Sequence, residues 1–332
     1  MERYILIDTL KEHALELANF PEAQDDNELV QIAVKKNGLA LEYASDRLRD
    51  DFDTVMLAVK KNGLSLEFAS DTLKRNEKII DAAIKSNGAA LQFVPQDLRN
   101  NRKLILQAAP NCNIEDIPEQ FLADEEIAEI LIDSDPAAFS YLPDELRKNT
   151  NFIIQAARKD GSIFMYVPDE TLENKAIVLK ISAEISGVLQ FVSEELTNDK
   201  EVALTAMKAP GSPYGYDALS SKLKTDADVV RTLIQHIRYG SDDECDFCHF
   251  FNVYNIPKQL LSDNVLIRKV VEIYECDDIV PDFSKDFALR AIELGICNTD
   301  LLSDELMDDP DIQEALSKIE CYKDEDEDEE NW

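Results

Sequence analysis

The chain has 332 residues, 45% of them hydrophobic, which is enough apolar sequence to bury more than one compact core. Only 9 Gly and 12 Pro occur, so the composition favours helices and argues against a loop-rich β architecture. The formal net charge of −34 at pH 7 argues against nucleic acid and acidic membranes as partners.

A 25-residue period begins near the start of the chain. Residues 33–48 read AVKKNGLALEYASDRL, and residues 58–73 read AVKKNGLSLEFASDTL. A small or apolar anchor residue recurs at Ala33, Ala58, Ala83, Ala108, Leu131, Ala156, Ile181 and Ala206. The fourth repeat, anchored on Ala108, is about two residues short. A repeat of this size cannot bury its apolar face alone, so neighbouring repeats are predicted to stack.

Each repeat is predicted to contain a long helix, a short helical return and a single turn. Val55 and Ala58 fall on one face of the long helix, and Ala58 is expected where neighbouring helices approach closely. Asn62 and Gly63 are predicted to end this helix, because glycine tolerates the left-handed conformation of a helix C-cap. Phe68 belongs to the short return.

The pattern therefore predicts an all-α chain, an α-solenoid or superhelix of about eleven 25-residue helical repeats. Asn76 and Asn101 are expected to cap the long helices that follow them. Residues 1–26 are predicted to form an N-terminal helical cap and residues 27–225 the regular repeats. Residues 226–322 are predicted to form divergent repeats with an insertion at about 238–255 and a C-terminal cap, followed by a disordered acidic tail at 323–332.

Residues 53–74, DTVMLAVKKNGLSLEFASDTLK, resemble an α-helical tandem-repeat family of unknown function. The likeness covers residues 27–101 and extends to about residue 200. It implies helical repeats and carries no catalytic residue with it. A looser likeness to leucine-rich-repeat variants, which pair an α-helix with a tighter helix, implies a right-handed superhelix.

The ninth repeat, anchored on Leu233, departs most from the period, because about a dozen extra residues fall within 238–255. Acidic residues run directly into aromatic residues here: Asp242, Asp243, Glu244, Asp246, Phe247, Phe250, Phe251 and Tyr254. Insertions in repeat arrays often project on the binding face, so one hypothesis is a partner-binding hook. We favour the alternative that the aromatic residues fill the gap between irregular repeats, because large aromatics are more often buried than exposed.

Cys245, Cys248 and His249 match the C-x-x-C-H pattern of c-type haem attachment and could form half of a zinc site. Haem attachment needs secretion, and the start of the chain lacks the apolar stretch of a signal peptide. A zinc site needs a second ligand pair. We therefore predict no cofactor and keep these three residues as secondary metal candidates. The three histidines lie in no catalytic motif, so no catalytic residue and no enzyme activity are predicted.

The charge is unevenly distributed. Residues 27–101 carry 11 Lys/Arg and 11 Asp/Glu, whereas residues 241–332 carry 7 Lys/Arg and 27 Asp/Glu. We predict a non-enzymatic scaffold that binds a protein partner with a basic surface, docking through the C-terminal half. The alternatives are an acidic mimic or inhibitor that occupies a basic site on its target, and an enzyme or metal site at 238–255.

Six cysteines without regular spacing and no apolar stretch long enough for a membrane span predict a cytoplasmic protein that binds neither nucleic acid nor membrane. Delivery into another cell is left open. The sequence does not distinguish a monomer from an oligomer.

Overall fold

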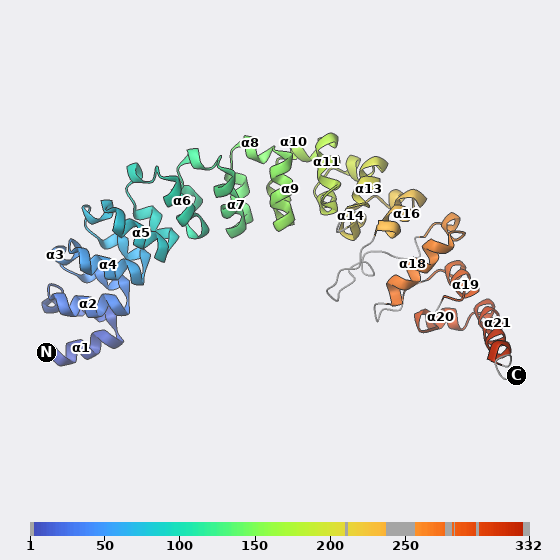
Figure 1. Cartoon of the computed structure of the whole chain (residues 1–332), viewed down its shortest axis with the longest axis horizontal. Coiled ribbons are helices and arrows are strands. Elements are labelled where there is room, and N and C mark those ends of the chain that lie inside the picture. Colours follow the sequence, from blue (N-terminus) through green and yellow to red (C-terminus); the bar gives the residue numbers. More distant parts are fainter. Residues whose placement is uncertain are drawn as a thin grey trace. The chain divides into compact units, whose positions relative to one another are not determined.

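The computed structural model describes residues 3–209, 212–236, 256–275, 281, 283–296 and 299–327, and all regular elements in these ranges are helices (Figure 1). The prediction of an all-α chain is confirmed. The chain forms two compact units, residues 1–152 and 153–332. The boundary between them falls inside the stretch 27–225 that the sequence predicts to be one series of regular repeats.

In the first unit each repeat has three parts. The long helices are α1 (Arg3–Glu12), α2 (Asn27–Lys36), α4 (Phe52–Lys61), α5 (Glu77–Ser86), α6 (Arg102–Ala108) and α7 (Glu125–Ser134). The short 3-10 helices are η1 (Ala14–Asn19), η3 (Gly38–Tyr43), η4 (Gly63–Phe68), η6 (Gly88–Phe93), η8 (Ala109–Asn111) and η11 (Pro136–Tyr141). The turn segments are η2 (Pro21–Ala23), α3 (Asp46–Arg49), η5 (Leu73–Arg75), η7 (Gln96–Leu98), η9 (Ile114–Asp116), η10 (Glu119–Phe121) and α8 (Asp144–Arg147).

Helix α9 (Thr150–Lys159) contains the boundary between the units. The long helices of the second unit are α11 (Lys175–Ser182), α13 (Lys200–Ala206), α16 (Ala227–His236), α18 (Asn264–Glu275), α19 (Lys285–Glu293) and α21 (Pro310–Glu327). Its shorter elements are η12 (Gly161–Tyr166), α10 (Asp169–Leu172), η13 (Ser186–Gln190), α12 (Glu194–Thr197), α14 (Ser212–Ala218), α15 (Ser221–Lys224), η15 (Lys258–Leu260), η16 (Thr299–Leu301) and α20 (Asp304–Met307).

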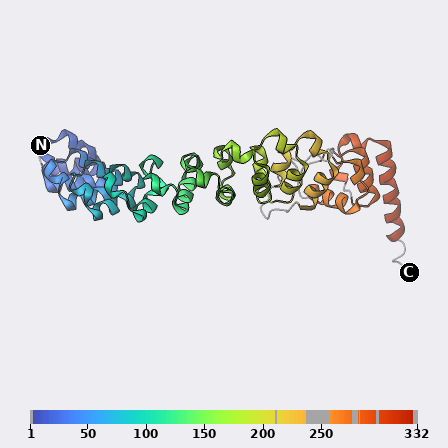
Figure 2. The same ribbon diagram turned by 90° about the horizontal axis from the view of Figure 1, so that it is seen from above.

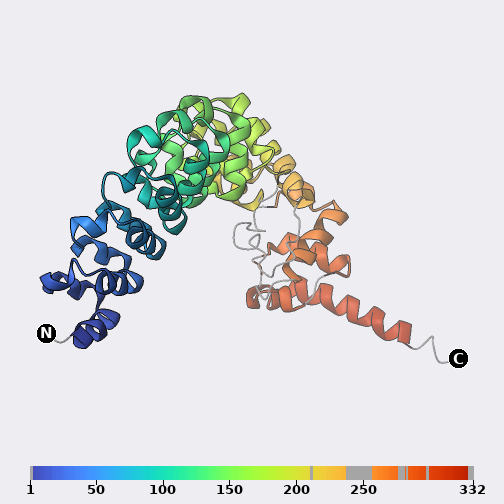
Figure 3. The same ribbon diagram turned by 60° about the vertical axis from the view of Figure 1, so that its left-hand side comes forward.

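Successive repeats of the first unit stack along the chain. Helices α1, α2, α4, α5, α6 and α7 each pack on the next, and they follow one another from blue to green in Figure 3. The short helices η1, η3, η4 and η6 pack on one another in the same order. The anchors Ala33, Ala58, Ala83 and Ala108 are fully buried, as the expected close approach of the helices requires.

The repeated glycines lie where the sequence analysis expects a break, but they serve a different purpose. The backbone of Gly63 is not left-handed; among the described glycines only Gly295 has a positive φ, of 65°. A Cβ atom on Gly63 would instead overlap the carbonyl oxygen of Ala83, the anchor of the next repeat. Gly38 and Gly88 meet Ala58 and Ala108 in the same way. The left-handed C-cap prediction is therefore wrong, and the glycines are needed for close approach.

The asparagine before each of these glycines joins two helices. Asn62 has an extended backbone, and its N–H donates to the carbonyl of Ala58 at the end of α4. Its side-chain oxygen accepts a hydrogen bond from the Leu64 N–H at the start of η4, at 3.1 Å. The predicted caps Asn76 and Asn101 are confirmed, since each accepts backbone N–H bonds from the first turn of α5 or α6.

A basic residue at the first position of a long helix contacts two acidic residues at the start of the next long helix. The distances between charged atoms are 2.5–2.9 Å. The sets are Arg3 with Asp26 and Glu28, Arg102 with Asp124 and Glu126, Lys175 with Asp199 and Glu201, Lys200 with Asp226 and Asp228, and Lys285 with Asp309 and Asp311. In each set the first acid is the cap residue of its helix.

The cap residue follows the charge of the preceding helix start. Where a helix begins with Phe52 or Glu77, the next helix is capped by the neutral Asn76 or Asn101. Asparagine makes the same cap bonds as aspartate but is neutral. An aspartate in its place would lack a cation where the preceding helix begins with Phe52 and would face another acid where it begins with Glu77. Helix α2 begins with the neutral Asn27, yet the next long helix has an acidic cap, Asp51. The Asp51 carboxylate instead accepts hydrogen bonds from the N–H and the hydroxyl of Thr54.

Replacing Arg102 by Met is expected to make stability less sensitive to acid. The Arg102 guanidinium bound to Asp124 holds the pKa of that carboxyl below its ordinary value. The ionised carboxylate therefore stabilises the folded chain fully above the unfolded-state pKa of about 3.9, and this contribution is lost as the pH falls through the lower folded-state pKa. Urea unfolding at a series of pH values should show lower stability of Arg102→Met at neutral pH and a smaller loss between about pH 5 and pH 2.

The matched control is Lys103→Met, which removes the same charge from the next position of α6, where the structure gives the ammonium group no salt bridge to a described residue. This variant should keep the full acid sensitivity of the unsubstituted chain. Equal profiles for the two variants would contradict the role given to the Arg102–Asp124 pair.

Both ends of the described chain contain helix. Residues 3–23 repeat the order of long helix, 3-10 helix and turn, with Leu10 and Leu17 fully buried. Helix α21, red in Figure 2, continues to Glu327. It therefore includes residues 323–327, which the sequence predicts to be disordered. The prediction of a disordered acidic tail at 323–332 stays untested as a whole, because residues 328–332 lie outside the described residues.

Candidate functional site

The fourth repeat breaks the pattern of its neighbours. Helices α4 and α5 continue three residues beyond their anchors, whereas α6 ends at its anchor, Ala108. Pro110 follows, and proline has no N–H to continue the helix. The six-residue 3-10 helix of the earlier repeats is reduced to η8, which has three residues. The side of the fourth repeat that a six-residue 3-10 helix would cover is therefore open.

A groove of about 370 Å³ lies between η8–η9 and η11. The contact between η8 and η11 is slight, unlike the packing between the earlier 3-10 helices. Leu131 and Ala138 are buried beneath the groove, and Cys112 is half-buried in its wall. The Ser134 hydroxyl lies 3.0 Å from both the Pro110 carbonyl and the Ile130 carbonyl of its own helix, so its one proton is shared between a bond to η8 and a bond within α7.

Tyr141 stands at the edge of this groove with 57% of its surface exposed. The aromatic residues at the same position of earlier repeats, Tyr43, Phe68 and Phe93, are half-buried against the core. The shortened 3-10 helix therefore leaves uncovered an aromatic ring that the regular repeats pack.

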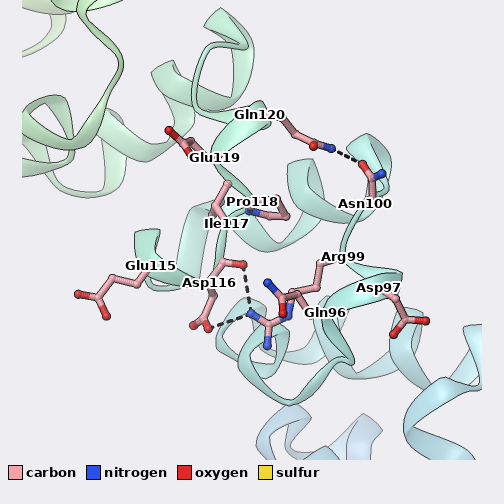
Figure 4. Close-up of a pocket in the computed structure, with 10 residues that line it drawn as sticks. All are labelled: Gln96, Asp97, Arg99, Asn100, Glu115, Asp116, Ile117, Pro118, Glu119 and Gln120. Atoms are coloured by element: carbon pink, nitrogen blue, oxygen red, sulfur yellow. Dashed lines mark hydrogen bonds and ion pairs between the residues drawn. The ribbon is translucent and has the colours of Figure 1, made fainter.

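A second depression, of about 450 Å³, lies on the turn side of the same repeat (Figure 4). Arg99 fills its base: its side chain donates to the carbonyls of Gln92 and Val94 at 2.7 and 2.8 Å, and to the backbone and side-chain oxygens of Asp116 at 3.3 and 3.2 Å. The Arg99 and Asp116 side chains are each only 17% exposed. Arg99 thus holds the segment around η9 in place, and most of its N–H groups are already bonded within the protein rather than available to a ligand.

The other residues drawn in Figure 4 lie nearer the surface. Gln120 donates a hydrogen bond to Asn100, and the carboxylates of Glu115 and Glu119 extend away from Arg99. The turn-side depression is therefore internally bonded at its base and acidic at its rim.

The surroundings of both depressions are strongly acidic. Between Lys103 and Arg147 the chain has no Lys, Arg or His and 11 Asp or Glu. The sequence analysis compared residues 27–101 with 241–332 and passed over this stretch. A count of charges in short windows along the whole chain would have found it.

The thiol in the groove wall is not activated. Burial, with a smaller contribution from Asp116, raises the pKa of the Cys112 thiol to about 11, so the reactive thiolate is scarce at neutral pH. Across the described ranges, no three or more His, Cys, Asp or Glu side chains are grouped so as to hold a metal ion.

The site residues predicted from the sequence lie outside the described residues. This holds for the hook and for the metal candidates: Asp242, Asp243, Glu244, Cys245, Asp246, Phe247, Cys248, His249, Phe250, Phe251 and Tyr254. Both hypotheses stay predictions.

The family model of a domain of unknown function, DUF4116, matches residues 26–74, 76–109 and 124–172. The three stretches are thus similar to that domain and follow one another in tandem. The predicted resemblance to a repeat family of unknown function is thereby confirmed. The matches omit residues 110–123, which follow the early end of α6 and supply one wall of the groove, Cys112 to Glu115.

No curated protein and no solved structure matches the chain. Among the helices described here, none has the length and apolar content needed to span a bilayer.

Proposed function

We propose that the chain is a non-enzymatic helical-repeat scaffold that binds a protein partner with a basic surface, and that it does so through the first unit rather than through the C-terminal half, where the charge distribution alone predicts docking. The observation that carries the proposal is the open side of the fourth repeat, where the 3-10 helix is shortened to three residues and an exposed tyrosine, Tyr141, stands beside a groove. Exposed aromatic residues beside preformed grooves are typical anchors of protein interfaces. The charged residues that recur at the starts of the long helices cap those helices and form salt bridges between neighbouring repeats. We therefore assign them a structural role.

The proposal places the protein in a reducing, cytoplasm-like compartment, which its unevenly spaced cysteines favour. It does not include nucleic acid as a partner, because a net charge of −34 repels phosphate backbones.

Affinity capture with the full chain, followed by direct binding of the purified candidate partner, tests this function. We expect a one-to-one or higher-order complex with a protein whose binding surface is basic. The proposal is wrong if no purified protein candidate binds at micromolar concentrations, or if the chain turns over a small-molecule substrate.

The charge also favours a second candidate, an acidic mimic that occupies a basic site on its target. The effect of salt separates the two. A scaffold complex with desolvated apolar contacts should weaken only moderately at high ionic strength, whereas a mimic held by charge should dissociate and should compete with other polyanions.

A further inference from the structure

We propose that the groove between the fourth and fifth repeats binds a Lys or Arg side chain from an extended basic segment of the partner protein. This inference rests on the proposed function and names the part of the partner that the groove recognises. Three properties of the groove support it: its preformed shape, the arrangement of its apolar and acidic walls, and its electrostatic surroundings.

The groove exists without a ligand because the fold keeps it open. The α-helix of the fourth repeat ends before Pro110, and the Ser134 hydroxyl, shared between the Pro110 and Ile130 carbonyls, connects η8 to α7. Its volume of about 370 Å³ is near the lower end of the roughly 300–1,000 Å³ range of ligand pockets. One long side chain and a short stretch of its backbone would fill such a space.

The walls match the two halves of a basic side chain. The half-buried Cys112 and Ile114 offer apolar surface to an aliphatic stem, and the exposed carboxylates of Glu115 and Asp135 line the groove where a cationic tip would sit. The exposed Tyr141 ring adds a face on which an ammonium or guanidinium group is attracted by the ring electrons.

The electrostatic surroundings select a cation over an anion or a neutral residue. Of the 11 acidic residues between Lys103 and Arg147, Asp116, Asp124, Glu126 and Asp144 form salt bridges with basic residues outside the stretch. The carboxylates of Glu115 and Asp135 at the groove have no salt bridge to a described residue. One oxygen of Asp135 accepts the cap bond from the Ala137 N–H at 2.9 Å, and no bond to the other oxygen is found within the described residues. A basic segment would therefore approach in a favourable field and find carboxylates at the groove.

The test uses the full chain and three labelled synthetic peptides: one with alternating Lys and Gly, one with alternating Arg and Gly, and one with Gln in place of each basic residue. Fluorescence anisotropy at low and physiological ionic strength should show binding of both basic peptides and none of the Gln peptide. Absence of binding by the basic peptides, or equal binding by the Gln peptide, overturns the inference.

Variants then assign the binding to the groove. Tyr141→Ala should weaken it about tenfold, and the double variant Glu115→Gln/Asp135→Asn about fivefold. Asparagine already occupies the position of Asp135 at Asn37, Asn62 and Asn87, where it makes the same cap bond, so this substitution removes charge and keeps the fold. The control Asp160→Asn, the equivalent cap residue before η12, should change binding less than about twofold.

The outcomes separate this inference from the function on which it rests. A protein partner that binds the unsubstituted chain and Tyr141→Ala equally well would refute the groove assignment and leave the scaffold function intact. If no protein partner binds at all, the scaffold function fails, whatever the peptides do.

Discussion

Gly63→Ala lowers the free energy of unfolding by about 3 kcal/mol, although it adds only one methyl group. The new Cβ atom would overlap the carbonyl oxygen of Ala83 and would lie 2.9 Å from the backbone nitrogen of Asn87. Both are backbone atoms of the next repeat, so no side-chain rotation can relieve the overlap. The two repeats must separate, and the buried contacts between α4 and α5 are lost with them. Urea unfolding followed by circular dichroism measures this change.

The matched control is Gly161→Ala, since Gly161 begins η12 as Gly63 begins η4. A Cβ atom on Gly161 meets no atom within 4 Å, and its φ is not in the left-handed region. Here alanine should leave stability unchanged or raise it by up to about 1 kcal/mol, because it restricts the unfolded chain. Equal unfolding midpoints for the two variants would show that close approach does not explain the repeated glycines.

This pair of glycines also marks how far the sequence could predict the fold. The period of the anchors and the Asn-Gly dipeptides correctly locates the helix ends, because both are local features of the chain. An Asn-Gly dipeptide after a helix is compatible either with a left-handed cap or with a close contact. The contact partner of Gly63 is Ala83, in the next repeat, so only the packing of the two repeats decides between them.

The candidate site was less predictable. The sequence shows that the fourth repeat is about two residues short, but a missing pair of residues does not reveal which side of a repeat opens. Pro110 is the local signal that the long helix ends early and that the six-residue short helix is interrupted. Tyr141 is exposed because the preceding repeat does not cover it. A pattern read along the sequence does not contain such contacts between repeats.

Arg99→Ala is expected to lower the free energy of unfolding by about 3 kcal/mol and to loosen the segment around η9. The substitution removes donors to Gln92 and Val94 and leaves the largely buried carboxylate of Asp116 without its cation. Limited proteolysis should show faster cleavage within residues 109–121 than in the unsubstituted chain. Urea unfolding gives the magnitude.

The control is Arg49→Ala, because Arg49 occupies the same turn position two repeats earlier. Its side chain donates to the Ala44 carbonyl at 2.8 Å, as Arg99 does to Val94, but it is 37% exposed and its nearest carboxylate is 3.9 Å away. We expect a loss of about 1 kcal/mol and no new cleavage near residues 109–121.

Arg99→Ala also tests whether the Arg99–Asp116 salt bridge positions the wall of the groove. Arg99 is not among the residues that line the groove, yet it holds Asp116, and the two residues before Asp116 form part of the groove wall. If the wall is positioned in this way, Arg99→Ala should weaken basic-peptide binding even at temperatures where the chain is fully folded, while Arg49→Ala should not. Unchanged binding in a folded Arg99→Ala chain would mean that other contacts keep the groove open, and that the Arg99–Asp116 pair serves stability only.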